Sequence, residues 1–203
     1  MAEQSRRRLI LASASPFRRR MLEAAGLSFE VAAADVDEAA IKRGLMERTQ
    51  MPAEIAATLG AAKALSVSAR APEALVIGAD QVLAFDGELF SKPATLAEAR
   101  RQLLRLRGQS HQLHTAVALA TGEEAVWKLV DTATLTMRSF SEAFLDAYLR
   151  QAGERVCHTV GAYEIEGPGI QLFERVEGDI FTIIGLPLLP LLGELRIRGA
   201  IAA

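Results

Sequence analysis

Apolar runs of strand composition alternate with helical stretches along almost the whole of this 203-residue chain. Runs of aliphatic and β-branched residues that are bounded by turn residues predict strands. We expect strands at RLILAS (8–13), FEVAA (29–33), ALVIGADQVLAF (74–85, interrupted by GADQ), HQLHTAVALAT (111–121) and AVWKLVDTATLTMRSF (125–140), and a hairpin at GIQLFERVEGDIFTIIG (169–185) that turns at Glu177-Gly178-Asp179. The dipeptide Asp86-Gly87 predicts a tight turn after the third strand.

Capping signals delimit the helices between these strands. Ser15 with Pro16 begins a helix that Gly26 ends, and Thr95 with Glu98 forms a capping box. We expect helices at about 16–25, 38–49, 52–70, 96–107, 142–151 and 187–198. The chain has no linker, repeat or low-complexity tract, so we predict one α/β domain over residues 1–203. It would contain a mixed, twisted sheet with flanking helices, arranged as two lobes around a central cleft.

Composition and charge narrow the class of protein. Half of the residues are hydrophobic and 24% are charged, as in an ordinary globular protein. The formal net charge of −2 argues against a general nucleic-acid or membrane binder, so an anion site must come from a local cluster. Apolar runs are too short for a signal peptide or a membrane span. Cys157 is the one cysteine, which suits a reducing compartment, and we expect a cytoplasmic protein.

Several familiar catalytic motifs are missing from the sequence. It has no P-loop, no GxGxxG after a strand and no GxSxG elbow. The histidines lack metal-ligand spacing, and we expect His111 and His114 to be hydrogen-bonded structural residues. We expect Cys157 to be a buried structural thiol, because its neighbour His158 would point the other way in an extended segment.

The segment SASPFRRR (13–20) joins the first strand to the first helix. The hydroxyls of Ser13 and Ser15, the free backbone N–H groups of the helix start and the guanidinium of Arg18 together favour a phosphate site. The alternative is a capped helix with a solvated arginine face, and we adopt it for Arg19, which would pair with Glu23, and for Arg20.

Asp80 lies inside the most apolar strand candidate. A carboxylate there is costly to bury unless it is paired, binds a metal or is exposed where the strand ends. An aspartate in a bulge or turn permitted by Gly78 is the alternative. We favour a functional role because Gln81 follows directly, which places two polar side chains in succession on an apolar strand.

The acidic segment DVDE (35–38) offers Glu38 as a partner for Asp80 in a divalent-cation site. Mg²⁺ takes one or two carboxylates and completes its shell with water and phosphate oxygens. A solvated helix N-terminus is the alternative for Glu38. Lys63, on an alanine-rich helix, and Lys92, before a proline, complete the set of candidate residues.

These segments, in this order, resemble the Maf family of nucleoside triphosphate pyrophosphatases. The matching motifs are LASASPFRRRML (11–22), DVDE (35–38), AAKA (61–64), IGADQV (77–82), DGELFSKP (86–93), EARRQLLRLRGQSHQLHTAVAL (98–119), GAYEIEGPG (161–169) and IIGLPL (183–188). The resemblance implies a single Maf-like α/β domain with a central cleft. It also implies hydrolysis of a nucleoside triphosphate to the monophosphate and pyrophosphate with a divalent cation such as Mg²⁺, Mn²⁺ or Co²⁺.

The resemblance also assigns roles residue by residue. Asp80 matches the family's catalytic aspartate, which accepts the proton of water, and Glu38 matches an acidic residue associated with the metal. The residues that match the polar and basic groups around the triphosphate are Ser13, Arg18, Lys63 and Lys92. Such roles fit a reaction that depends on positioning and charge neutralisation.

Three positions linked to base choice in the family depart from its commonest pattern. That pattern has two arginines after the proline, and the first is Phe17 here; the other two positions are Gln81 and Glu166. This set is similar to that of members acting on 7-methyl-GTP and differs from that of members favouring dTTP and UTP. A cationic 7-methylguanine is attracted to an aromatic face, and a carboxylate accepts hydrogen bonds from guanine N–H groups.

Three alternatives stay open. Phe17 shares a helix face with Met21 and Ala25, which is also the pattern of plain core packing. The substrate could be dTTP or UTP instead of 7-methyl-GTP. In a different class of function, the chain could be a nucleotide-binding regulator of cell division, because Maf proteins are associated with arrest of septum formation. A homodimer is compatible with either class.

Overall fold

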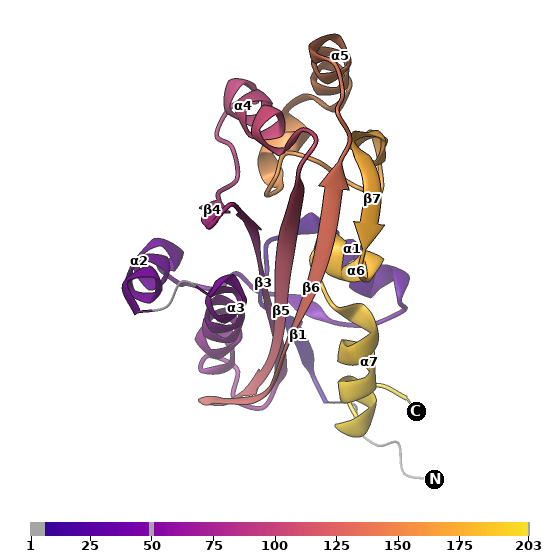
Figure 1. Cartoon of the computed structure of the whole chain (residues 1–203). Coiled ribbons are helices and arrows are strands. Elements are labelled where there is room, and N and C mark those ends of the chain that lie inside the picture. The colour runs from indigo at the N-terminus through magenta and orange to yellow at the C-terminus, as the bar shows by residue number, and fades with distance from the viewer. Residues whose placement is uncertain (1–6, 49–50, 203) are drawn as a thin grey trace.

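The computed structural model describes residues 7–48 and 51–202, and within them one mixed seven-stranded sheet (Figure 1). Its strands are β1 (Leu9–Leu11), β2 (Glu30–Val31), β3 (Leu75–Phe85), β4 (Glu88–Phe90), β5 (Ser110–Thr121), β6 (Glu124–Met137) and β7 (Phe173–Glu177). Their order is β2-β1-β3-β5-β6-β7, with β4 beside one end of β3. Strand β1 runs parallel to β2 and β3, and the other pairs are antiparallel. The predicted α/β class with a mixed sheet is confirmed.

Helices flank this sheet, and each of the described α-helices except Ile180–Ile184 lies where the sequence predicts a helix. They are α1 (Pro16–Ala24), α2 (Glu38–Arg48), α3 (Pro52–Ser68), α4 (Leu96–Leu106), α5 (Glu142–Ala152), α6 (Ile180–Ile184) and α7 (Leu188–Ile197), with 3₁₀ segments η1 (Gly153–His158) and η2 (Pro168–Leu172). Ser15 and Thr95 cap α1 and α4 by accepting a backbone N–H through their hydroxyl oxygens. Asp86 and Gly87 have φ values of 51° and 75°, which confirms the predicted tight turn. None of the described helices is long and apolar enough to cross a membrane.

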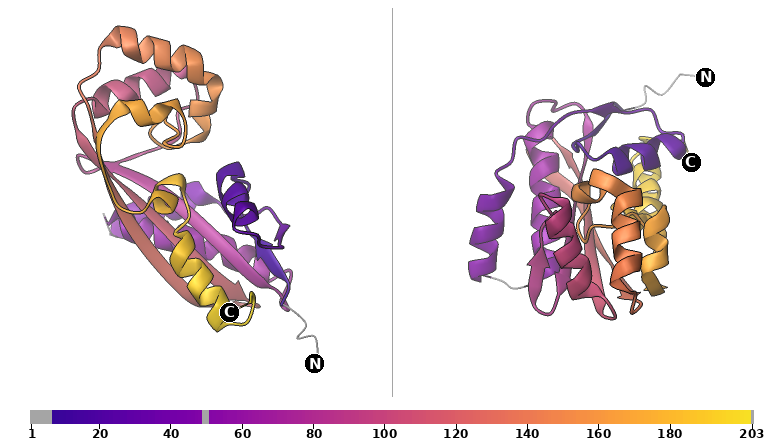
Figure 2. Two further views of the ribbon diagram at one scale, coloured as in Figure 1. Left: turned by 90° about the vertical axis from the view of Figure 1, so that its right-hand side faces the viewer. Right: turned by 90° about the horizontal axis from the view of Figure 1, so that it is seen from above.

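The long strands β5 and β6 connect two lobes with separate buried cores. The distal lobe, formed by α4, α5, η1 and η2 at one end of these strands, has a core that includes Leu103, Leu135 and Leu145. The basal lobe, formed by α1, α3 and α7 around β1 and β3, has cores that include Leu11 and Leu191. Figure 2 shows the two lobes at opposite ends of the sheet. This arrangement agrees with the predicted two lobes.

The prediction of a hairpin over 169–185 is wrong in its second half. Only Phe173–Glu177 forms a strand, and Ile180–Ile184 forms helix α6. The reason is a cap: the Oδ1 atom of Asp179 accepts the backbone N–H of Thr182 at 3.0 Å, which starts a helix where a returning strand was expected. Gly185, with a φ of 124°, then ends it.

The predicted interruption of β3 at GADQ is also wrong, and so is the alternative of a bulge at Gly78. Strand β3 pairs with β5 in unbroken antiparallel register from Val76 to Ala84. Gly78 serves a different purpose: a Cβ atom there would lie 2.5 Å from the backbone nitrogen of Ala64 and would also clash with the carbonyl of Gly60. The glycine therefore lets helix α3 lie directly on the strand.

The structure agrees with the hydrogen bonding predicted for the two strand histidines but not with the burial predicted for the cysteine. His111 and His114 are buried, as expected of structural residues, and one ring nitrogen of each makes a hydrogen bond: Nε2 of His111 to the hydroxyl of Tyr163 at 2.8 Å, and Nδ1 of His114 to that of Thr132 at 3.0 Å. Burial lowers the pKa of His111 to about 4, so it stays neutral. Cys157 is half-buried, not buried, and packs against the core of the distal lobe, because η1 places it at the edge of that core.

Candidate active site

An opening between β1 and β4 leaves the middle of β3 without a neighbouring strand on one edge, within the described part of the chain. On this edge β1 pairs with Leu75–Ile77 and β4 pairs with Leu83–Phe85, and no described strand pairs with residues 78–82 between them. Asp80 and Gln81 lie in this opening. Successive side chains of a strand point to opposite faces, so the two side chains enter the same cleft from the two sides of β3.

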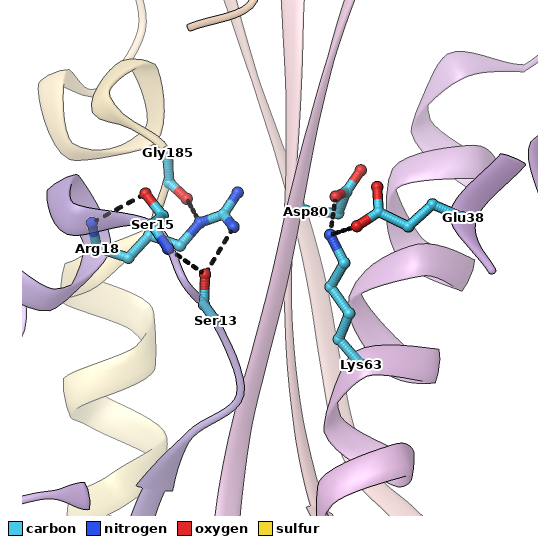
Figure 3. A network of polar contacts seen from close by, with 7 residues as sticks. All are labelled: Ser13, Ser15, Arg18, Glu38, Lys63, Asp80 and Gly185. Carbon is cyan, nitrogen blue, oxygen red and sulfur yellow. Dashed lines mark hydrogen bonds and ion pairs between the residues drawn. The ribbon is translucent and has the colours of Figure 1, made fainter. Parts of the chain in front are cut away.

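A lysine bridges two carboxylates on one side of β3 (Figure 3). The Nζ atom of Lys63 lies 2.6 Å from Oδ1 of Asp80 and 2.8 Å from Oε1 of Glu38. The Asp80 and Lys63 side chains are only 8% and 12% exposed, whereas that of Glu38 is 45% exposed. The other carboxylate oxygen of Asp80, Oδ2, is buried and makes no hydrogen bond with the described residues. Asp80 therefore has an acceptor that the described residues leave unused.

The close approach of α3 to β3 positions this cluster. Gly78 on the strand lacks the Cβ atom that would clash with α3 at Gly60 and Ala64, and Lys63 is on the helix turn that follows Gly60. Glu38 comes from the first turn of α2. Burial acts to raise the pKa of Glu38, but the ion pair with Lys63 and the charges of Lys42 and Lys92 outweigh it, so the pKa is lowered.

A buried arginine lies on the other side of the cleft. Nε of Arg18 donates to the carbonyl of Gly185 at 2.7 Å, and Nη1 of Arg18 donates to Oγ of Ser13 at 3.2 Å (Figure 3). Ser13 does not line the cleft itself but supports Arg18, while the hydroxyl of Ser15 accepts the backbone N–H of Arg18 at 3.5 Å. Burial lowers the pKa of Arg18, against the attraction of Asp80 and Glu38. An anion bound here would stabilise the guanidinium.

Lys92 enters the cleft from the loop between β4 and α4. Helix α4 holds this loop on both sides of the lysine: Gln102 donates to the carbonyl of Ser91 at 2.8 Å, and Glu98 accepts the N–H of Ala94 at 2.7 Å. Desolvation, and then repulsion by Arg18 and Lys63, lowers the pKa of Lys92. The cations of the cleft therefore repel one another, which favours the binding of a polyanion.

The three residues expected to read the base line the same cleft. Phe17 is on α1, Gln81 is on β3 and Glu166 is in the turn before η2. Phe17 is half-buried, with the guanidinium of Arg20 at 5.0 Å from its ring centre. Phe17 belongs to none of the buried hydrophobic clusters of the described residues. Plain core packing therefore does not describe this side chain. Arg19 pairs with Glu23 at 2.7 Å and is exposed, as predicted.

The donor set suits a hard divalent cation held by two carboxylates. The described residues contain no cluster of three or more His, Cys, Asp or Glu side chains of metal-binding geometry. Asp80 nevertheless lines the cleft and has the unpaired atom Oδ2, and Glu38 shares a lysine with it. Two carboxylates with remaining positions for water and phosphate oxygens fit the preference of Mg²⁺.

The sequence analysis missed several residues that line the cleft. Lys42 follows Glu38 by four positions and so lies on the same face of α2, a spacing that could have identified it. His158, Glu164 and Gly185 have no comparable local signal, because the distal lobe and α6 bring them to the cleft from distant parts of the chain.

Comparisons with known proteins agree with this arrangement. A family model described as Maf-like protein matches residues 8–197. A protein of Paramagnetospirillum magneticum named nucleoside triphosphate pyrophosphatase is 54% identical over 94% of this chain and 98% of its own length. A protein of Rhizobium meliloti named 7-methyl-GTP pyrophosphatase is 49% identical over 96% of this chain and 98% of its own length. A protein of Brucella abortus with the same name is 48% identical over 93% of this chain and 95% of its own length.

Proposed function

The chain belongs to the Maf family, and we propose that it is a nucleoside triphosphate pyrophosphatase, a hydrolase that converts a nucleoside triphosphate to the monophosphate and pyrophosphate. Its preferred substrate would be a modified nucleotide such as 7-methyl-GTP. The names of relatives that share about half of its residues over nearly their whole length support this proposal. The observation that carries it is a carboxylate, Asp80, with a buried unpaired oxygen amid the cations of one cleft.

The cleft residues divide the chemistry among them. Asp80 orients the attacking water and accepts its proton at Oδ2 as the α–β phosphoanhydride bond breaks. Arg18 and Lys92, with Ser15 at the helix start, bind the triphosphate and neutralise the charge that develops on pyrophosphate. Lys63 has two roles: it lines the cleft, where it would attract the phosphates, and its ion pair with Asp80 fixes the catalytic base in place.

Glu38 and Asp80 would hold the divalent cation, for which Mg²⁺, Mn²⁺ and Co²⁺ are candidates. A bound cation supplies charge neutralisation to the phosphates and lowers the pKa of water. Lys63 pairs with both of these carboxylates and would hold them close to each other.

The base-reading residues favour 7-methyl-GTP. The ring of Phe17 offers an aromatic face to a cationic base, and the carboxylate of Glu166 accepts hydrogen bonds from guanine. Replacement of an arginine by phenylalanine removes a donor that could bind the carbonyl oxygens of thymine or uracil. This difference separates the proposed substrate from dTTP and UTP.

A nucleotide panel tests the proposal. Purified protein with Mg²⁺, Mn²⁺ or Co²⁺ is incubated with 7-methyl-GTP, GTP, dTTP and UTP, and the nucleotide and phosphate products are separated. We expect 7-methyl-GMP and pyrophosphate, with the highest kcat/KM for 7-methyl-GTP. Comparable or faster hydrolysis of dTTP would contradict 7-methyl-GTP as the preferred substrate. Release of orthophosphate in place of pyrophosphate would contradict the proposed cleavage of the α–β bond.

We also propose that the protein acts in the cytoplasm, that it does not bind nucleic acid, and that it forms a homodimer. The single half-buried cysteine and the net charge of −2 support the first two points. Leu189 and Ile197 on α7, which are 63% and 80% exposed, are candidates for a self-association surface. Light scattering at several concentrations measures the mass, and a monomer throughout would contradict the dimer.

A further inference from the structure

Three acceptors hold the side-chain amide of Gln81. Its Nε2 atom lies 2.9 Å from Oγ1 of Thr115, 3.0 Å from the carbonyl of Thr182 and 3.0 Å from the carbonyl of Ile183. A carbonyl oxygen only accepts hydrogen bonds, so the group that faces both carbonyls must be the NH₂ group. This leaves Oε1 as the polar atom of Gln81 for a ligand in the cleft.

The carbonyls belong to the C-terminal end of the short helix α6 and to the glycine that caps it. The carbonyl of Thr182 accepts the backbone N–H of Gly185 at 3.1 Å and also accepts the amide of Gln81, which donates to the carbonyl of Ile183 as well. The carbonyl of Gly185, the C-cap residue, accepts Nε of Arg18 at 2.7 Å. The C-terminal end of α6 thus orients one residue of the base site and one of the phosphate site.

Thr182 fixes this helix to the sheet. It is fully buried, and its hydroxyl donates to Oδ2 of Asp131 on β6 at 2.6 Å. Its carbonyl accepts both Gln81 and the hydroxyl of Thr115, the residue opposite Gln81 on β5, at 2.9 Å. The side chain of Thr182 therefore anchors α6 while its backbone holds the amide.

We infer that Thr182 is a positioning residue for base recognition, which locks the Gln81 amide so that Oε1 accepts a hydrogen bond from the 2-amino group of the base. This inference rests on the proposed function. With the carboxylate of Glu166 in the same cleft, the site presents two acceptors, which match the adjacent N1–H and 2-amino donors of guanine. Thymine and uracil present one N–H between two carbonyl oxygens, so an acceptor would face an acceptor.

The lock is tested first without any ligand, by NMR of side-chain NH₂ groups in ¹⁵N-glutamine-labelled protein. Comparison with Gln81→Ala assigns the Gln81 signals. We expect its NH₂ protons to exchange with water at least tenfold more slowly than those of exposed glutamines, and Thr182→Val to remove most of this protection. Thr182→Ser, which keeps the hydroxyl, restores it. Exchange at the rate of an exposed glutamine in the unchanged protein would overturn the inference.

The recognition step is tested by binding of product nucleotides, which needs no turnover. The unchanged protein should bind 7-methyl-GMP about fivefold more tightly than 7-methyl-IMP, which lacks the 2-amino group, since one hydrogen bond is worth about 1 kcal/mol. Thr182→Val should reduce this ratio toward one and Thr182→Ser should restore it. Thr132→Val, which removes a strand hydroxyl outside the cleft, is the matched control and should keep the ratio.

The outcomes separate the inference from the proposed function. An unchanged ratio in Thr182→Val, or no ratio in the unchanged protein, overturns the inference even if 7-methyl-GTP is hydrolysed. A ratio that Thr182→Val abolishes supports the inference even if the nucleotide panel shows no hydrolysis.

Discussion

The ammonium of Lys63 lies 2.6 Å from Oδ1 of Asp80, with both side chains almost buried. Each charge is costly to bury alone, so each is stabilised by the other. The pairing also holds Asp80 in a single orientation, with Oδ1 occupied and Oδ2 unpaired. An ion pair that serves structure on one oxygen thus leaves the other oxygen for chemistry.

Lys63→Met should destabilise the protein more than Asp80→Asn does. The first change leaves two carboxylates, Asp80 and Glu38, without their shared cation, and we expect a loss of about 3 kcal/mol in the free energy of unfolding. The second leaves Lys63 paired with Glu38, and we expect a loss of about 1 kcal/mol or less. Urea unfolding at pH 7 measures both, and the reverse order would contradict the assignment of Lys63 as the centre of the cluster.

Asp80→Asn should lower kcat by about 10²–10⁴-fold, since the amide cannot accept the proton of water. Asp146→Asn, which changes an exposed partner of Arg100 in the distal lobe, is the matched control and should keep kcat. Steady-state kinetics with 7-methyl-GTP provides the measurement. An unchanged kcat in Asp80→Asn would contradict the assignment of Asp80 as the catalytic base. Lost turnover with persistent arrest of division in cells would instead support a separate regulatory function.

The pKa of Lys92 predicts an alkaline limit to activity. Its folded-state pKa lies below the ordinary 10.5, so as the pH rises the lysine loses its charge earlier than an exposed lysine does, and phosphate binding weakens. We expect kcat/KM, which reports the free enzyme, to fall at a pH below 10.5. Lys92→Arg should shift this fall to higher pH because arginine stays charged. A fall at the same pH in both proteins would assign it to another group.

Glu38 should contribute to the loss of stability in acid. Its pKa is lowered in the folded protein, so its stabilising charge is present above the unfolded value of 4.5 and is lost as the pH falls through the folded value. Glu38→Gln removes this titration. We therefore expect the variant to lose less stability than the unchanged protein between pH 6 and pH 3, measured by urea unfolding. Equal losses in the two proteins would show that Glu38 does not pair with Lys63 in solution.

Gly78→Ala should affect both stability and catalysis. The added Cβ atom would meet α3 at Ala64, 2.5 Å from its backbone nitrogen, and displace the helix that carries Lys63. We expect a loss of about 1–3 kcal/mol and a lower kcat. Gly44→Ala, at a helical glycine with open space around it, is the control and should be neutral or stabilise by up to about 1 kcal/mol. A well-folded, fully active Gly78→Ala protein would reject the close-packing explanation.

Local signals in the sequence were sufficient for most of the elements. Ser15, Thr95 and Ser141 cap helices through contacts with residues three positions on, and Asp86-Gly87 needs only its own backbone to turn. These interactions lie within a few residues, so the pattern predicts them without knowledge of the fold. The same holds for the chemical character of the candidate residues, since Asp80 in an apolar strand is unusual wherever the strand lies.

Tertiary structure alone decided how those residues work together. Asp179 caps a helix where the composition predicts a strand, and Thr182 in this helix donates to Asp131, which is 51 positions away on β6. The carbonyl of Thr182 accepts Gln81, 101 positions away, and the carbonyl of Gly185 accepts Arg18, 167 positions away. Lys63 likewise became the partner of Asp80 only because Gly78 admits α3 onto the strand. Contacts at such separations depend on how the lobes pack around the sheet, and no local pattern encodes them.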